Sequence, residues 1–156
     1  MWRNNPVNSI DPSGELITRI SGASGNWGIV IDRSCNTYKH FIELALEDLQ
    51  RRIPKCVKPG RLKDCLNEIT FTIKCKRCNA AGYTRVPFVR DTIGLCIPHA
   101  FTGENGPLGA IILHEMVHLC TPFRSRIPFY GENLPKSCEE ACYGEGFYFN
   151  ECRPCQ

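Results

Sequence analysis

The sequence predicts one cysteine-rich α+β domain in which a small twisted sheet packs against a buried helix. The first observation is that residues 107–120 are apolar almost all round, apart from three polar residues in the order H-E-x-x-H. The second is the cysteine content, which is eleven in 156 residues. The third is a set of short apolar runs, typical of strands, at 15–20, 28–32, 68–75 and 91–98.

Composition excludes several classes of protein. With 42% hydrophobic and 22% charged residues, the chain has the content of an ordinary globular domain that can bury a core. The net charge of +3 is small, and no run of Lys or Arg exceeds two residues, so we expect no nucleic-acid partner. No stretch approaches 18 apolar residues, so we expect no membrane span. The N-terminus lacks a signal-peptide pattern, so secretion or delivery into a target cell would depend on another device.

The first half of the chain is expected to contain two strands and a helix. Residues 15–20 and 28–32 are bounded by Gly and Ser and predict strands or a hairpin. Residues 37–53 carry apolar side chains at helical spacing, and Pro54 is expected to end that helix. A basic segment with Pro and Gly, residues 55–64, is expected to be a connection.

The second half is expected to lead through strands to the buried helix. Residues 68–75 alternate clearly and predict a strand, and 83–89 predicts an edge or irregular strand because of Pro87. Residues 91–98 predict the last strand, and Thr92–Ile97 is expected at the sheet edge, where an extended peptide could add by β-pairing. No strong periodicity follows Pro122.

The helix over 107–120 carries the chemistry of the sequence. Pro107 suits its first turn. Residues four apart lie on one helix face, so His114 and His118 present two imidazoles to the same point. Two imidazoles at that spacing can hold Zn²⁺, and Glu115 is placed to act on a metal-bound water. Since a buried helix gains nothing from unpaired ionisable groups, a pair of core histidines explains the pattern less well.

The cysteines allow two interpretations. They indicate disulfides in an oxidising compartment or thiolate metal sites, and the odd number leaves at least one thiol unpaired. The C-x-x-C pairs Cys75/Cys78 and Cys152/Cys155 have the spacing of a four-thiolate zinc ribbon, although 73 residues separate them. Disulfides are favoured, and Cys120 could then be a partner of Cys138 or Cys142.

Residues 5–14, N-P-V-N-S-I-D-P-S-G, resemble the end of the RHS (YD-repeat) core, which typically runs N-P-x-N-x-x-D-P-x-G. In that family a variable C-terminal toxin follows this segment. The resemblance implies that residues 1–14 are a remnant of an RHS carrier and that 15–156 are the toxin domain. It also implies a neutralising immunity protein as a partner.

A second resemblance concerns residues 92–146, which look like the deuterolysin-type zinc endopeptidases, or aspzincins. In those zincin-like domains H-E-x-x-H is followed by D-x-x-Y-G, whose Asp is the third zinc ligand, and this chain has Glu140-Ala-Cys-Tyr143-Gly144. The resemblance implies Glu140 as the third ligand, with the adjacent Glu139 as the alternative, and the Tyr143 hydroxyl as an oxyanion donor. It departs from the family in having Glu for Asp. Neither Asp nor His occurs downstream, where the other carboxylates are Glu132, Glu145 and Glu151.

These observations predict a zinc metalloendopeptidase with Zn²⁺ as cofactor and a protein or peptide as substrate. Glu115 would take the proton of a zinc-bound water and later deliver it to the leaving amine. One rival interpretation is a binding module, stapled by cysteines or built on a zinc ribbon, in which the metal is structural. Another is a zinc amidase that acts on a non-peptide bond.

Overall fold

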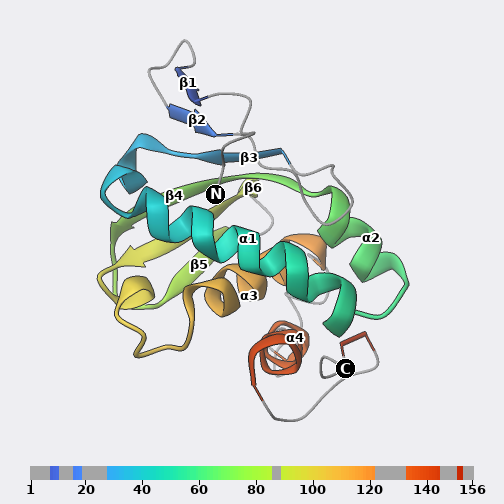
Figure 1. The fold of residues 1–156 in the computed structure, drawn as a ribbon. Helices are drawn as coiled ribbons and strands as arrows, with labels where there is room; N and C mark the ends of the chain where they lie inside the picture. The colour runs from blue at the N-terminus through green and yellow to red at the C-terminus, as the bar shows by residue number, and fades with distance from the viewer. Residues whose placement is uncertain are drawn as a thin grey trace.

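The computed structural model describes residues 8–10, 16–18, 28–85, 89–121, 133–144 and 151–152. The described strands form a two-stranded pair and a four-stranded sheet of order β3-β4-β6-β5. In the larger sheet β3, β4 and β6 run parallel and β5 runs antiparallel at one edge. Helix α1 crosses in front of this sheet in Figure 1, and α3 packs against both β5 and β6 and against α4.

The N-terminal strands pair differently from the expected hairpin. Strand β2 (Leu16–Thr18) pairs with β1 (Asn8–Ile10), whereas β3 (Gly28–Ile31) pairs in parallel with β4. Both strands were predicted, but a hairpin between them is wrong. The β1–β2 pair also crosses the proposed boundary between residues 14 and 15, since Ile10 lies opposite Leu16.

Helix α1 (Lys39–Cys56) follows a short 3-10 helix, η1 (Arg33–Tyr38). Its buried side chains fall at spacings of four, three and four residues, which forms one apolar stripe: Ile42, Leu46, Leu49 and Ile53. The prediction that Pro54 ends the helix is wrong. The amide of Val57 donates to the carbonyl of Ile53 at 3.1 Å, so the last turn closes beyond the proline.

Helix α2 (Arg61–Glu68) occupies part of the segment expected to be a connection. Leu62 and Leu66 lie four residues apart and are both buried, so the helix has a narrow apolar face. A face of two leucines is too short to give a clear periodic signal.

The last strand before the helix that carries H-E-x-x-H lies in the interior of the sheet. Strand β4 (Thr70–Arg77) alternates as predicted, with Phe71, Ile73 and Cys75 buried. Strand β6 (Val89–Ile97) pairs with β4 on one side and with β5 (Gly82–Arg85) on the other. The expectation that 91–98 lies at the sheet edge is therefore wrong, and β5 is the edge strand. Residues 93–96 are all buried, as an interior strand covered on both faces requires.

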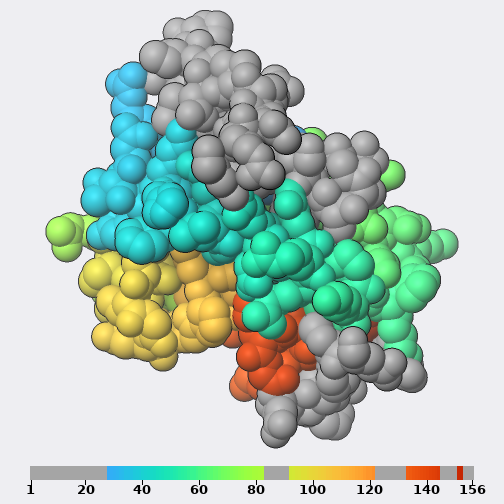
Figure 2. Space-filling model, viewed as in Figure 1, coloured from blue at the N-terminus to red at the C-terminus, as the bar shows by residue number. Residues whose placement is uncertain are grey.

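Helix α3 (Leu108–Cys120) follows η2 (His99–Phe101) and carries the H-E-x-x-H residues. Most of its residues are buried, as predicted, but Pro107 occupies the N-cap position and not the first turn, where it was expected. Helix α4 (Asn133–Tyr143) was not predicted. In Figure 2 the side chains of α1 cover the middle of the viewed face, with α4 below them. None of the described helices is long and apolar enough to cross a bilayer.

Five disulfides within the described residues join these elements, which confirms the favoured interpretation of the cysteines. Two of them hold α4: Cys56–Cys142 links it to α1, and Cys138–Cys152 links it to the segment near the C-terminus. The others are Cys35–Cys75, Cys65–Cys120 and Cys78–Cys96. Cys120 therefore pairs with Cys65 of α2, and the prediction that it joins Cys138 or Cys142 is wrong.

Candidate metal centre

Helix α3 places the two predicted imidazoles beside each other. The ring centroids of His114 and His118 are 5.1 Å apart and the rings are tilted by 60°. Imidazoles bound through one nitrogen each to a tetrahedral zinc ion have centroids roughly 5 Å apart, given zinc–nitrogen bonds of about 2 Å. His118 is 6% exposed, so it is largely shielded from water. The observed separation permits both rings to bind one ion.

The Glu115 side chain lies between α3 and the edge strand β5. It is buried, and its Cγ lies 3.3 Å from the position that a Cβ on Gly82 would occupy. The same Cβ would lie 3.1 Å from the Gly94 carbonyl oxygen and 3.2 Å from Ile111. A glycine at position 82 therefore gives Glu115 its room beside the strand.

Helix α4 brings a carboxylate to the first imidazole. Oε2 of Glu139 lies 3.0 Å from Nδ1 of His114, an ordinary hydrogen-bond distance. The two side chains are 26% and 19% exposed, so the pair is partly shielded. Glu139 was the alternative ligand in the sequence and Glu140 the favoured one. The carboxylate that the structure pairs with His114 is thus Glu139, and Glu140 lies next to it, half-buried, on the same helix.

The signal that could have revealed α4 was present in the sequence. Leu134, Cys138 and Ala141 recur at helical spacing and are buried. Cysteine behaves as a small apolar residue when buried, so these positions form a stripe once Cys138 counts as apolar. The surrounding Pro and Gly residues hid that stripe.

Convergence of three ligands is not found among the residues whose side chains are described. No group of three or more His, Cys, Asp and Glu side chains there is arranged to hold a metal ion. Glu132 and Glu145, two other candidate carboxylates, lie outside the described residues. The donor types present, two neighbouring imidazoles and the Glu139 carboxylate beside one of them, fit zinc in their chemistry. Of the three predicted ligands, the structure thus places the two imidazoles, His114 and His118, side by side.

The less favoured alternative for Cys75, Cys78, Cys152 and Cys155, a four-thiolate zinc site, is wrong. Cys75 and Cys78 pair with Cys35 and Cys96, and Cys152 pairs with Cys138. A sulfur in a disulfide cannot act as a thiolate ligand. Cys155, the fourth residue of the predicted ribbon, lies outside the described residues. Even so, Cys155 could not complete that site, because its three predicted partners are no longer thiols.

Tyr143 is directed to the start of α3. A Cβ on Gly109 would overlap the tyrosine hydroxyl, so the phenol rests on the backbone of α3 at that residue. Gly109 precedes His114 by five residues, about 7.5 Å along the helix axis. The guanidinium of Arg52 lies 4.3 Å from the centre of the Tyr143 ring. The hydroxyl therefore packs at the start of α3, before the two histidines, and we do not propose the oxyanion role expected for Tyr143.

The surroundings of the phenol also keep it neutral. Burial raises the pKa of Tyr143 far above its ordinary value, and the carboxylate of Asp48 raises this pKa further, whereas Arg52 lowers it in part. The buried hydroxyl does not meet hydrogen-bond geometry with any described residue, although Asp48 lies close enough to affect its pKa. Tyr143 therefore contributes packing between α1, α3 and α4.

We expect Gly109→Ala to destabilise the domain, because the new methyl group would overlap the Tyr143 ring. Overpacking of this kind costs about 1–3 kcal/mol. Urea unfolding of Gly109→Ala, Tyr143→Leu and the double variant measures the coupling. In the double variant the alanine should cost much less, since the overlapping ring is gone. Equal costs in both backgrounds would show that Tyr143 does not occupy this position.

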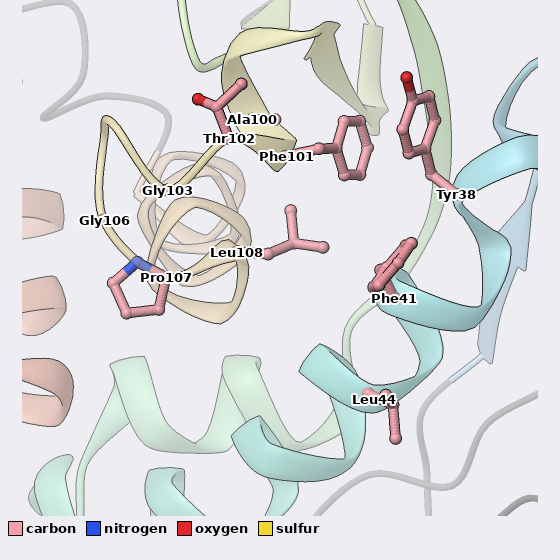
Figure 3. Close-up of a pocket in the computed structure, with 10 residues that line it drawn as sticks. All are labelled: Tyr38, Phe41, Leu44, Ala100, Phe101, Thr102, Gly103, Gly106, Pro107 and Leu108. Carbon is pink, nitrogen blue, oxygen red and sulfur yellow. The ribbon is translucent and has the colours of Figure 1, made fainter.

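A separate groove lies at the start of α3. It has a volume of about 420 Å³ and is lined mostly by apolar side chains of α1, η2 and the first turn of α3. Figure 3 shows Leu108 directed toward Phe41 across this space, and the rings of Tyr38 and Phe101 facing each other. These two rings stack at 3.9 Å. Leu108 precedes His114 by six residues, about 9 Å along the helix, so the groove is distinct from the metal centre.

Comparisons with known proteins identify no relative. No protein-family model, no curated protein and no solved structure matches the chain.

Proposed function

We propose that this chain is a zinc-dependent metalloendopeptidase. The observation that carries the proposal is the pair of imidazoles on α3, 5.1 Å apart, with the buried Glu115 between them in sequence and next to the edge strand. His114 and His118 would hold the ion, with Glu140 as the third protein ligand. When bound, zinc supplies Lewis acidity, which lowers the pKa of a water molecule and polarises a carbonyl group.

Glu115 is the proposed general base. Glu115 follows His114 directly in the sequence, and its side chain is buried. A carboxylate shielded from bulk water can keep a proton between two transfers. In the proposed reaction it takes a proton from the attacking water and delivers it to the leaving amine. Peptide hydrolysis needs both transfers, and one carboxylate can make them in succession.

Strand β5 supports a peptide as the substrate. It is the edge of the sheet nearest α3, and Gly82 of this strand lies against Glu115. An extended peptide that adds to a sheet edge satisfies its main-chain hydrogen bonds there. A peptide added at β5 would then run close to the proposed base. This edge takes the role that was predicted for the strand at Thr92–Ile97.

The proposed setting is that of a toxin domain delivered by an RHS-type carrier, with a cognate immunity protein. This part of the proposal depends on the string at residues 5–14, of which only Asn8–Ile10 is described in the structure. The five disulfides are compatible with an extracellular protein.

Zinc binding gives the direct test of the site. We expect the purified chain to bind about one zinc ion and His118→Ala to lose it, because a catalytic site with only two protein ligands is weak. Elemental analysis after gel filtration measures the bound metal. His40→Ala is the matched control, since His40 is exposed on α1 and should not affect the zinc content. A wild-type chain without zinc, or His118→Ala with full zinc content, would rule out the proposed site.

A further inference from the structure

We infer that Glu139 is a positioning residue, not a zinc ligand, and that it fixes the tautomer of His114. The inference rests on the proposed function, since it assigns the role of a residue in the same site. Its starting observation is the 3.0 Å contact between Nδ1 of His114 and Oε2 of Glu139.

The two ring nitrogens of a neutral histidine have opposite roles. One carries the proton and donates, and the other has a lone pair and can bind a metal. A carboxylate is only an acceptor when ionised, so a carboxylate beside Nδ1 favours the tautomer with the proton on Nδ1. The lone pair is then on Nε2, the nitrogen farther from the helix backbone. Glu139 thus prepares Nε2 of His114 to bind zinc.

If Nε2 of His114 binds the metal, the imidazole ring separates Glu139 from it, because Glu139 contacts Nδ1. To act as a ligand, Glu139 would have to turn its carboxylate away from Nδ1 and toward an ion on the Nε2 side of the ring. As a hydrogen-bond acceptor, it instead orients the ring and raises its basicity, as outer carboxylates do for metal-binding histidines. Glu140, its neighbour on α4, remains the candidate ligand.

Two disulfides constrain the backbone of α4 on either side of Glu139. Cys138, directly before it, is fully buried and bonded to Cys152, and Cys142, one turn later, is bonded to Cys56 of α1. Two disulfides therefore fix the turn of α4 that carries Glu139. A positioning role requires such rigidity, because a ring can be oriented only by a group that does not itself move.

The test uses the metal-free protein first. Long-range ¹H–¹⁵N correlation spectra at neutral pH report which nitrogen of His114 carries the proton. We expect the Nδ1–H tautomer in the wild type and in Glu140→Gln, and a shift toward Nε2–H in Glu139→Leu. Glu139→Gln keeps a carbonyl acceptor and should retain most of the wild-type tautomer. An unchanged tautomer in Glu139→Leu, or a wild-type ring with protons on both nitrogens, would overturn the inference.

Zinc affinity then separates the two neighbouring carboxylates. By competition with a chromophoric chelator we expect zinc to bind Glu139→Leu about 10–100-fold more weakly, the usual loss for an outer carboxylate. Glu140→Gln should lose more than this. If Glu139→Leu loses zinc as completely as His114→Ala, Glu139 is a ligand and the inference is wrong. If the wild type binds no zinc, the proposed function fails, while the tautomer still decides whether Glu139 orients His114.

Discussion

Glu115→Gln should abolish peptide hydrolysis while the chain keeps its zinc. The amide has nearly the same shape as the carboxylate, so the packing of this buried side chain against Gly82 is retained. It cannot accept a proton at neutral pH, however, and loss of a general base costs about 10²–10⁴-fold in rate. Cleavage of a denatured protein substrate, followed by mass spectrometry, measures the change, and elemental analysis confirms the metal.

The matched control is Glu104→Gln, an equal change of charge in the exposed loop before α3, which should leave the rate unchanged. The cleavage profile also separates the rival functions. A zinc-loaded wild type that cuts no protein, but hydrolyses a non-peptide amide in a Glu115-dependent manner, would replace the endopeptidase proposal with an amidase. Full proteolysis by Glu115→Gln would remove Glu115 from its role.

Removal of the Cys56–Cys142 disulfide should have the second large effect. This bond closes a sequence separation of 86 residues, whereas Cys78–Cys96 closes only 18. In the chain-entropy model the longer loop contributes about 4–5 kcal/mol and the shorter about 3 kcal/mol. We expect Cys56→Ala/Cys142→Ala to lower the melting temperature by roughly 10–15 °C, on the scale of a domain of this size.

This double variant should also weaken zinc binding, because it releases the end of α4 from α1. The main-chain carbonyl of Cys142 still accepts a hydrogen bond from Arg52 at 2.7 Å, so the helix keeps one tie to α1. Cys78→Ala/Cys96→Ala is the control, since that bond joins the segment after β4 to β6 and does not touch α4. For this control, calorimetry should show a smaller loss of stability than for Cys56→Ala/Cys142→Ala. Chelator competition should show that its zinc affinity is unchanged. Equal losses in both variants would contradict a specific role for the bond in α4.

The local parts of the structure could be predicted from the sequence. The alternation of Phe71, Ile73 and Cys75 gave strand β4, and the apolar stripe of α1 gave a helix. The pair His114 and His118 follows from helix geometry alone, because residues four apart share a face. Each of these features depends on side chains within a few residues of one another.

What could not be predicted depends on pairing between distant segments. Residues 91–98 lie inside the sheet because β5 pairs with them in an antiparallel direction. The sequence of residues 91–98 contains no sign of this partner strand. The partner of Cys120 is on α2, 55 residues away. Which of Glu139 and Glu140 contacts His114 depends on the rotation of α4 against α3, and a shift of one residue turns a helix by about 100°. Similarity in spacing to another family does not determine that rotation.

The disulfide pattern has a consequence for a chain that would itself cut peptide bonds. The spans 35–75, 56–142 and 138–152 overlap in sequence, so each peptide bond from Cys35 to Cys152 lies inside at least one covalent ring. A single nick anywhere in that range therefore releases no fragment. Accidental self-digestion would leave a nicked molecule whose two pieces stay joined by disulfides. The pieces would separate on a denaturing gel only after a thiol has reduced those disulfides.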